Sequence, residues 1–73
     1  MIEVRIFATL RQGREKVSML EPEAFQTAGQ ILDHLRIPRG EVSILLINGF
    51  QKKPEDTVKD GDILALFPPC GGG

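Results

Sequence analysis

The sequence predicts one α+β domain, in which a single helix packs across one face of a curved, mixed sheet of four to five strands. Residues 2–7 alternate between apolar and polar side chains, as a half-buried strand requires. Residues 28–35 carry one apolar stripe at helical spacing. Residues 63–67 form an apolar run that is typical of a strand in the centre of a sheet. With 73 residues, the chain has room for one domain and one core.

An N-terminal hairpin is expected first along the chain. Its first strand turns one set of alternate side chains toward the core, namely Ile2, Val4 and Ile6. Phe7 belongs to the opposite set and points to the other face of the sheet. Gly13 lies in a polar stretch that favours a turn, and residues 16–20 can return as the second strand.

The helix has a clear start and a clear stop. Thr27 and Gln30 have the spacing of a capping box, in which each side chain accepts a backbone hydrogen bond of the first turn. The apolar stripe consists of Ala28, Ile31, Leu32 and Leu35. Arg36 is expected in the last turn, where a cation suits the helix dipole, and Pro38 ends the helix. Gly29 is expected to weaken the helix by about 1 kcal/mol relative to alanine.

The second half of the chain reads as three further strands. Residues 42–47 are rich in leucine and β-branched side chains and end in Asn48-Gly49, a strong signal for a two-residue hairpin. Residues 50–53 form its short partner strand. The turn-rich segment 56–62 then leads to the last strand, which we place beside the first strand in the centre of the sheet.

One helix can cover only one face of this sheet, so the second face is open to solvent or to a partner. Phe7 and one alternate set of side chains of the last strand are expected on that open face. They would form an exposed apolar patch, and such patches usually mark binding sites.

The composition excludes several classes of function. Nine Lys and Arg against ten Asp and Glu give a net charge of −1, which argues against a dedicated nucleic-acid binder. His34 and Cys70, the single histidine and the single cysteine, cannot build a four-ligand zinc site, and we expect no bound metal or cofactor. No phosphate-binding loop or nucleophile elbow occurs. A small binding or carrier module is therefore favoured over an enzyme.

Cysteine use and hydropathy favour a cytoplasmic protein. Cys70 alone cannot form an internal disulfide, which suits a reducing compartment. No apolar run approaches the roughly 20 residues of a membrane span. The N-terminal residues resemble neither a basic leader nor an apolar signal core.

The chain divides into a folded domain, residues 1–67, and a flexible tail, residues 68–73. Pro68 and Pro69 restrict the backbone and stiffen its departure from the last strand. The three glycines that follow have no side chains and can enter a channel too narrow for other residues. Fully extended, the tail would reach about 20 Å and would end in an ionised carboxylate. The alternative is an ordinary frayed end.

Several short motifs occur in the same order along the chain as in a known family. They are Phe7-Ala8-x-x-Arg11, Asn48-Gly49, Lys59-Asp60-Gly61-Asp62, Leu66-Phe67-Pro68-Pro69 and the final Gly72-Gly73. With these motifs the chain resembles the MoaD/ThiS family of sulfur carriers, which are ubiquitin-like β-grasp domains, and it is most similar to the small subunit of molybdopterin synthase. It departs from that pattern at Cys70, where the family usually has valine, and at Gly71, which is often alanine or threonine.

The resemblance implies a carrier that acts as a co-substrate and has no active site of its own. A MoeB/ThiF-like enzyme would use ATP to adenylate the carboxylate of Gly73, and sulfur transfer would convert it to a thiocarboxylate. Gly71 and Gly72 would give access to the partner's active site, and Pro68 and Pro69 would set the direction of the tail. A MoaE-like large subunit would then receive the sulfur in molybdopterin or tungsten-pterin synthesis.

Three residues are the candidates for contact with partners: Phe7, Arg11 and Phe67. Phe7 and Phe67 are proposed from their place on the open face, and Arg11 from the resemblance. Other functions stay open, namely a sulfur carrier for thiamine, cysteine or another metabolite, a ubiquitin-like protein modifier, and a plain interaction domain. Cys70 is interpreted as a small apolar residue in the place of valine, with a reactive thiol as the alternative.

Overall fold

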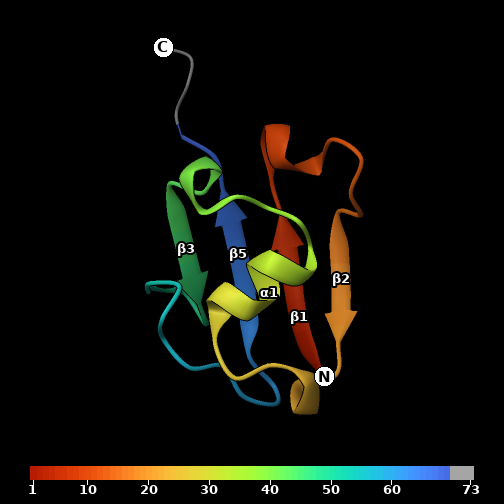
Figure 1. Cartoon of the computed structure of the whole chain (residues 1–73), viewed down its shortest axis with the longest axis vertical. Coiled ribbons are helices and arrows are strands. Elements are labelled where there is room, and N and C mark those ends of the chain that lie inside the picture. The colour runs from red at the N-terminus through yellow and green to blue at the C-terminus, as the bar shows by residue number, and fades with distance from the viewer. Residues whose placement is uncertain (70–73) are drawn as a thin grey trace.

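The computed structural model describes residues 1–69, which form a five-stranded mixed sheet with one α-helix on one face (Figure 1). The strands are β1 (Ile2–Ile6), β2 (Val17–Leu20), β3 (Ile44–Ile47), β4 (Phe50–Gln51) and β5 (Ile63–Phe67). The α-helix is α1 (Ala28–His34), and short 3₁₀ helices span Ala8–Arg11, Pro22–Ala24 and Arg39–Glu41. The predicted α+β class is confirmed.

The first and last strands of the chain lie side by side in the middle of the sheet. The strand order is β2-β1-β5-β3-β4, and β1 pairs with β5 in parallel, with Glu3 opposite Ile63 and Ile6 opposite Leu66. The other neighbours pair antiparallel. This confirms the prediction that these two strands lie side by side in the centre of the sheet.

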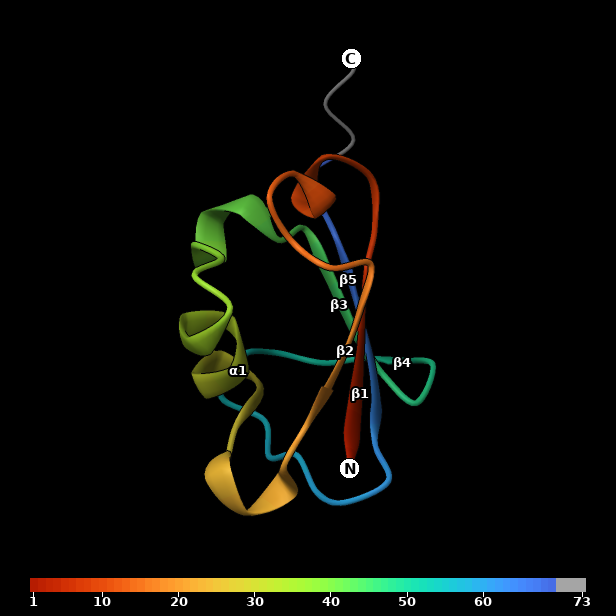
Figure 2. The same ribbon diagram turned by 90° about the vertical axis from the view of Figure 1, so that its right-hand side faces the viewer.

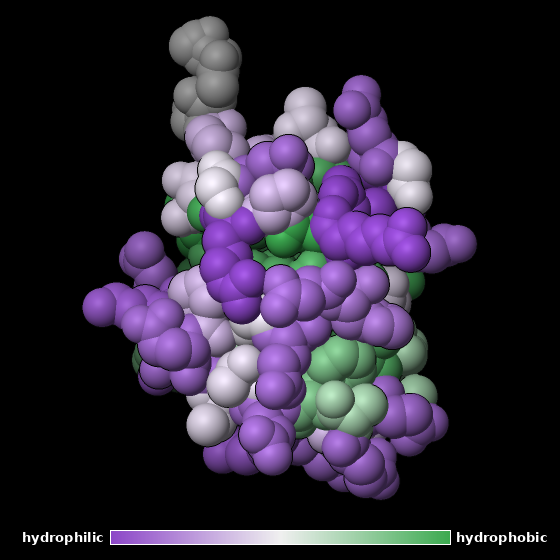
Figure 3. Space-filling view, in the orientation of Figure 1, coloured by the Kyte–Doolittle hydropathy of each residue, from purple (hydrophilic) through white to green (hydrophobic). Residues whose placement is uncertain are grey.

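The core lies between the sheet and α1. Its fully buried side chains include Ile2, Val4, Ile6, Ile31, Leu32, Leu64 and Leu66. Hydrophilic side chains cover much of the helix side of the molecule, with an apolar area at the lower right of the view (Figure 3). The apolar stripe of α1 is turned inward, since Ala28, Ile31 and Leu32 are buried. Figure 2 shows that α1 covers one face of the sheet only, and that the β3–β4 hairpin projects on the other side.

The start of α1 follows the predicted cap with one change. The Oγ1 atom of Thr27 accepts a hydrogen bond from the N–H of Gln30 at 3.3 Å, as predicted. The Oε1 atom of Gln30 accepts from the N–H of Gln26 at 2.6 Å, one residue before the position that a capping box requires.

The end of α1 differs from the prediction. The helix ends at His34, and Arg36 lies beyond it with a left-handed φ of 59°. Arg36 therefore does not provide the cation of the last turn. Arg14 takes that role from a distant part of the chain. Its guanidinium donates to the carbonyl oxygens of Leu35 at 3.3 Å and Arg36 at 2.8 Å, and also to that of Leu10 at 2.9 Å.

Replacing Arg14 by alanine is expected to lower the free energy of unfolding by about 2 kcal/mol, because three carbonyl groups lose a charged donor. Arg14→Lys should restore little of this loss, since one ammonium cannot reach three acceptors in the fixed geometry of a guanidinium. Arg39→Ala is the control, because its ion pair with Asp33 is exposed on both sides and such pairs contribute about 0–1 kcal/mol. Equal urea midpoints for the Arg14 and Arg39 variants would contradict this role of Arg14.

Glycine is required at position 29 because the loop after β4 approaches the helix backbone closely there. Helix propensity alone, which marks Gly29 as a weak point of α1, does not describe this position. Its N–H donates to the carbonyl oxygen of Pro54 at 2.7 Å, so the helix and the loop after β4 touch at this residue. A Cβ atom at position 29 would lie 3.2 Å from that oxygen and would collide with Nη2 of Arg39.

Gly29→Ala is therefore expected to lower the free energy of unfolding by about 1 kcal/mol, although alanine has the higher helix propensity. Gly40→Ala is the matched control, since a Cβ atom there meets nothing within 4 Å. Thermal unfolding measures both. A stabilised Gly29→Ala variant would show that the loop and Arg39 move aside at no cost.

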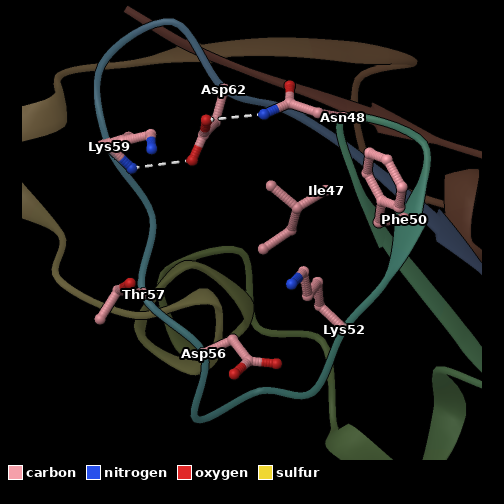
Figure 4. Close-up of a pocket in the computed structure, with 8 residues that line it drawn as sticks. All are labelled: Ile47, Asn48, Phe50, Lys52, Asp56, Thr57, Lys59 and Asp62. Atoms are coloured by element: carbon pink, nitrogen blue, oxygen red, sulfur yellow. Dashed lines mark hydrogen bonds between the residues drawn. The ribbon is translucent and has the colours of Figure 1, made fainter.

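The predicted Asn48-Gly49 hairpin joins β3 to β4, and a buried carboxylate fixes it to the start of β5. Asn48 and Gly49 have φ values of 54° and 86°, as a two-residue hairpin requires. The Asp62 carboxylate accepts from Nδ2 of Asn48 and from the N–H of Lys59, each at 2.9 Å (Figure 4). Asp62 is only 4% exposed, so this aspartate does more than form a turn.

Two strands, β3 and β4, are each two residues shorter than predicted. The ladder of β3 starts at Ile44 rather than at residue 42, because a 3₁₀ turn occupies residues 39–41 and the N–H of Val42 bonds back to Arg39. The ladder of β4 ends at Gln51 rather than at residue 53. There the N–H of Lys53 bonds to the Asp56 side chain, which turns the chain away from the sheet.

Within residues 1–69, the structure contains no helix with the length and hydropathy that a membrane crossing needs. The same part of the chain contains no group of three or more His, Cys, Asp and Glu side chains placed to hold a metal ion.

Candidate functional site

Two aromatic rings stack where β5 ends, on the face of the sheet that α1 does not cover. The ring centroids of Phe7 and Phe67 are 4.5 Å apart, and the ring planes differ by 7°. Their backbones are held together as well, because the N–H of Phe7 donates to the carbonyl oxygen of Leu66 at 3.1 Å. Both phenylalanines are half-buried. The structure thus brings together two predicted contact residues that are 60 positions apart in the sequence.

Arg11, the third predicted contact residue, lies over the same stack. Its guanidinium carbon is 5.7 Å from the centroid of the Phe7 ring, and its Nε donates to the carbonyl oxygen of Ile6 at 2.8 Å. The 3₁₀ helix Ala8–Arg11 makes this return possible. Ala8 starts it with a left-handed φ of 55°, and Leu10 anchors it in the core with 2% exposure.

The stack is one end of a wider apolar area on the uncovered side of the sheet, here called the open face. Exposed apolar side chains on this face are Val17, Met19, Ile44 and Ile63, each between 39% and 52% exposed. An ion pair between Glu3 and Arg5 on β1 lies among them. An apolar area of this kind, with few charged side chains among its residues, is suited to contact with another protein.

A hollow of about 330 Å³ is a second candidate, at the other end of the sheet (Figure 4). It lies between the β3–β4 hairpin and the loop before β5, and its lining includes Phe50, Lys52 and Asp62. Both carboxylate oxygens of Asp62 are already hydrogen-bonded to Asn48 and Lys59. The carboxylate of Asp62, a residue that is 4% exposed, therefore supports the hairpin.

The model of the ThiS family matches residues 4–73 of this sequence. The chain belongs to the ThiS family. A comparison with curated protein sequences gives no match. Three solved structures from Haloferax volcanii are similar in fold to this chain.

The crystal structure of SAMP1 shares 24% identity with this ThiS-family chain at a TM-score of 0.73, and covers 99% of this chain and 98% of its own. A crystal structure of small archaeal modifier protein 1 shares 23% identity at a TM-score of 0.70, with coverages of 93% and 95%. The solution structure of the HVO 2177 protein shares 31% identity at a TM-score of 0.73, with coverages of 99% and 85%.

These matches identify the fold as the ubiquitin-like β-grasp, as the sequence motifs implied. ThiS-family carriers and proteins of the SAMP type are small and generally without catalytic activity. Membership of the ThiS family also implies partners of two general kinds, an activating enzyme and an acceptor.

The tail of this ThiS-family chain starts beside the Phe7–Phe67 stack. Pro68 is half-buried and Pro69 is exposed, directly after the end of β5. The predicted reacting residue Gly73, the access residues Gly71 and Gly72, and Cys70 lie outside the described residues. The prediction that the tail is flexible falls on these residues and stays a prediction.

Two shifted pKa values occur at the other end of this ThiS-family domain. The hydrogen bond to Asp60 raises the pKa of the Met1 α-amino group, and the same bond lowers the pKa of the Asp60 carboxyl. Both groups are largely exposed and lie near the start of β1, whereas the Phe7–Phe67 stack lies beyond its end. They therefore do not belong to the aromatic site.

Two features of this ThiS-family chain were not predicted from the sequence: the place of Val17 and Met19 on the open face, and the role of Arg14 at the end of α1. Val17 and Met19 alternate along β2 in the same way as the residues of β1, and this was the available signal for their place on the open face. Arg14 had no such signal, because the three acceptors of its guanidinium come together only in the folded chain.

Proposed function

We propose that this protein is a sulfur carrier whose Gly73 carboxylate is adenylated and converted to a thiocarboxylate. The Phe7–Phe67 stack is the observation that carries the proposal, together with membership of the ThiS family. The stack forms part of an apolar docking surface directly before Pro68, where the tail starts. A partner that binds there is in position to receive the tail.

The chemistry takes place in two steps in the partner's active site. A carboxylate oxygen of Gly73 attacks the α-phosphorus of ATP on a MoeB/ThiF-like enzyme, and pyrophosphate leaves. Hydrosulfide then attacks the carbonyl carbon, and AMP leaves with the electron pair of the broken C–O bond, so that the thiocarboxylate forms in this single displacement. The carrier contributes the carboxylate and its tail, ATP is bound by the enzyme, and no side chain of the carrier acts as a catalyst.

The acceptor in this proposal is a MoaE-like large subunit in molybdopterin or tungsten-pterin synthesis. The motif Phe7-Ala8-x-x-Arg11 and the Pro68-Pro69 pair support this choice, since both resemble the small subunit of molybdopterin synthase. In the fold, Phe7, Arg11 and Phe67 form one surface beside the proline pair. The reactions are placed in the cytoplasm, in agreement with the single cysteine of the chain.

A protein modifier is the second candidate function. Two of the similar solved structures are named as SAMP1 and small archaeal modifier protein 1, which favours this alternative. The first step would be the same adenylation, but a lysine amine of a target protein would then displace AMP and form an isopeptide bond. Sulfur delivery to thiamine, cysteine or another metabolite would use the same thiocarboxylate.

Intact mass spectrometry separates these functions. The full chain is incubated with the activating enzyme of its own cell, ATP and a sulfur source, with and without cell protein. Exchange of one oxygen for sulfur is the result expected for a carrier. Isopeptide adducts on lysine would favour the modifier, and an unchanged mass would contradict both. Loss of the thiocarboxylate when a MoaE-like subunit and its pterin precursor are added would identify the pathway.

A further inference from the structure

A second hollow lies on the helix side of the molecule, away from the open face. Its volume is about 230 Å³, and it lies between α1, the 3₁₀ helix Arg39–Glu41 and strands β3 and β4. Its floor is formed by Val42 and Pro54, which are half-buried, and by Leu32 and Leu45, which are buried core residues with 0% and 4% exposure. Nothing in the proposed sulfur chemistry uses this hollow.

The walls of this hollow carry positive charge. Three cationic residues line it, Arg39, Lys52 and Lys53, and its lining contains no carboxylate. This is a strong local bias, because the whole chain has a net charge of −1. Glu41 and Glu55 flank the hollow in the sequence but do not line it.

Arg39 is held in place beside the hollow by two features. Its Nη1 donates to Oδ1 of Asp33 on α1 at 2.8 Å. Its Nη2 lies against Gly29, where any side chain would collide with it. A cation that is already positioned loses less conformational entropy when it binds an anion than a free side chain does. Lys53 adds a charge that can move, and Lys52 stands between this hollow and that of Figure 4.

Size and lining together indicate the kind of ligand. Small-molecule sites usually have volumes of about 300–1,000 Å³, and this hollow is smaller. An apolar floor adds nothing to the binding of a bare phosphate ion, but it can bury one apolar side chain. Acidic residues on either side of that side chain would meet the cationic walls, which gives complementarity of charge.

We propose that this hollow, defined by Leu32, Arg39, Val42, Leu45, Lys52 and Lys53, docks an acidic peptide segment of a partner protein that carries one apolar anchor residue. The anchor lies against Val42 and Pro54, and its acidic neighbours pair with Lys52 and Lys53, beside the ion pair that Arg39 forms with Asp33. Because the open face is on the other side of the sheet, a partner can hold the domain here while the tail is engaged elsewhere (Figure 2).

The test is an NMR titration of the full chain with the capped peptide Glu-Asp-Leu-Asp-Glu at low ionic strength. We expect saturable shifts of the amide signals of residues 39–45 and 51–53, and weaker binding as salt is added. The double variant Lys52→Glu, Lys53→Glu should bind at least tenfold more weakly. Lys16→Glu is the matched control, because Lys16 is exposed and does not line the hollow, and its affinity should change less than twofold.

Three further probes can overturn the proposal. Equal binding of the neutral peptide Gln-Asn-Leu-Asn-Gln would show that charge has no part. Equal binding of Glu-Asp-Gly-Asp-Glu or of inorganic phosphate would show a simple anion site with no anchor. Shifts spread over the whole domain, or the same loss in Lys16→Glu as in the double variant, would show non-specific attraction. The spectrum of each free variant shows whether it is folded, and Arg39→Gln provides an independent loss of charge.

Discussion

Adding one alanine after Gly73, or deleting Gly73, is expected to abolish adenylation and thiocarboxylate formation without changing the thermal stability of the domain. The extra residue moves the carboxylate about 3.5 Å along an extended chain and adds a methyl group in a narrow channel. A misplacement of about 1 Å can already lower a rate by about 10²-fold. Intact mass spectrometry with the activating enzyme, ATP and a sulfur source measures the result.

Cys70→Val is the control for this experiment. Valine is the residue that the resembled carriers usually have at this position, so adenylation and thiocarboxylate formation should stay largely intact. Two results would contradict the role of Gly73. One is a thiocarboxylate on the chain that is extended by alanine, and the other is a loss of sulfur transfer in the Cys70 variant alone. The first result would show that the position of the carboxylate is not critical, and the second would place the chemistry at the thiol of Cys70.

Phe67→Ala should weaken the binding of the activating enzyme by more than about 1 kcal/mol, as expected for an aromatic hot-spot residue of an interface. The variant loses the ring stacked on Phe7 and the apolar area that the two rings share. Because Phe67 points to the open face and not into the core, the isolated domain should stay folded. Calorimetry or surface plasmon resonance gives the affinity, and circular dichroism gives the fold.

Phe50→Ala is the matched control for the loss of an aromatic ring. Phe50 is 70% exposed and pairs with Ile47, so it lies at the other end of β3 from Ile44, the neighbour of Phe67. Its replacement should leave the affinity within about twofold. Unfolding of Phe67→Ala would show that Phe67 is a core residue, and equal losses of affinity in both variants would spread the interface over the whole sheet.

Local signals in the sequence were enough for the strands and for the start of the helix. The alternation in β1 and the apolar run of β5 gave their faces and their central place, since both depend on side-chain periodicity. The end of α1 could not be predicted in the same way. It is fixed by Arg14, whose hydrogen bonds to Leu35 and Arg36 join residues 21 and 22 positions apart.

In the candidate site too, some features follow from local signals in the sequence and others depend on contacts between distant parts of the chain. Phe7 and Phe67 were predicted on one face because each strand alternates, but their ring stacking depends on the parallel register of β1 and β5. Gly29 was interpreted by its helix propensity, whereas its main constraint is the carbonyl of Pro54, which comes from another part of the chain. Propensity is a local quantity and contains no information on such an approach.

The position of β5 in the middle of the sheet also determines how the molecule opens. Edge strands such as β2 and β4 can detach while the rest of the sheet persists, so their amide hydrogens exchange with solvent through small local fluctuations. Release of β5 would break its ladders to both β1 and β3 at once. We therefore expect its amides to exchange mainly when the whole domain unfolds. The tail is thus attached to one of the three inner strands of the sheet, where exchange is expected to be slow.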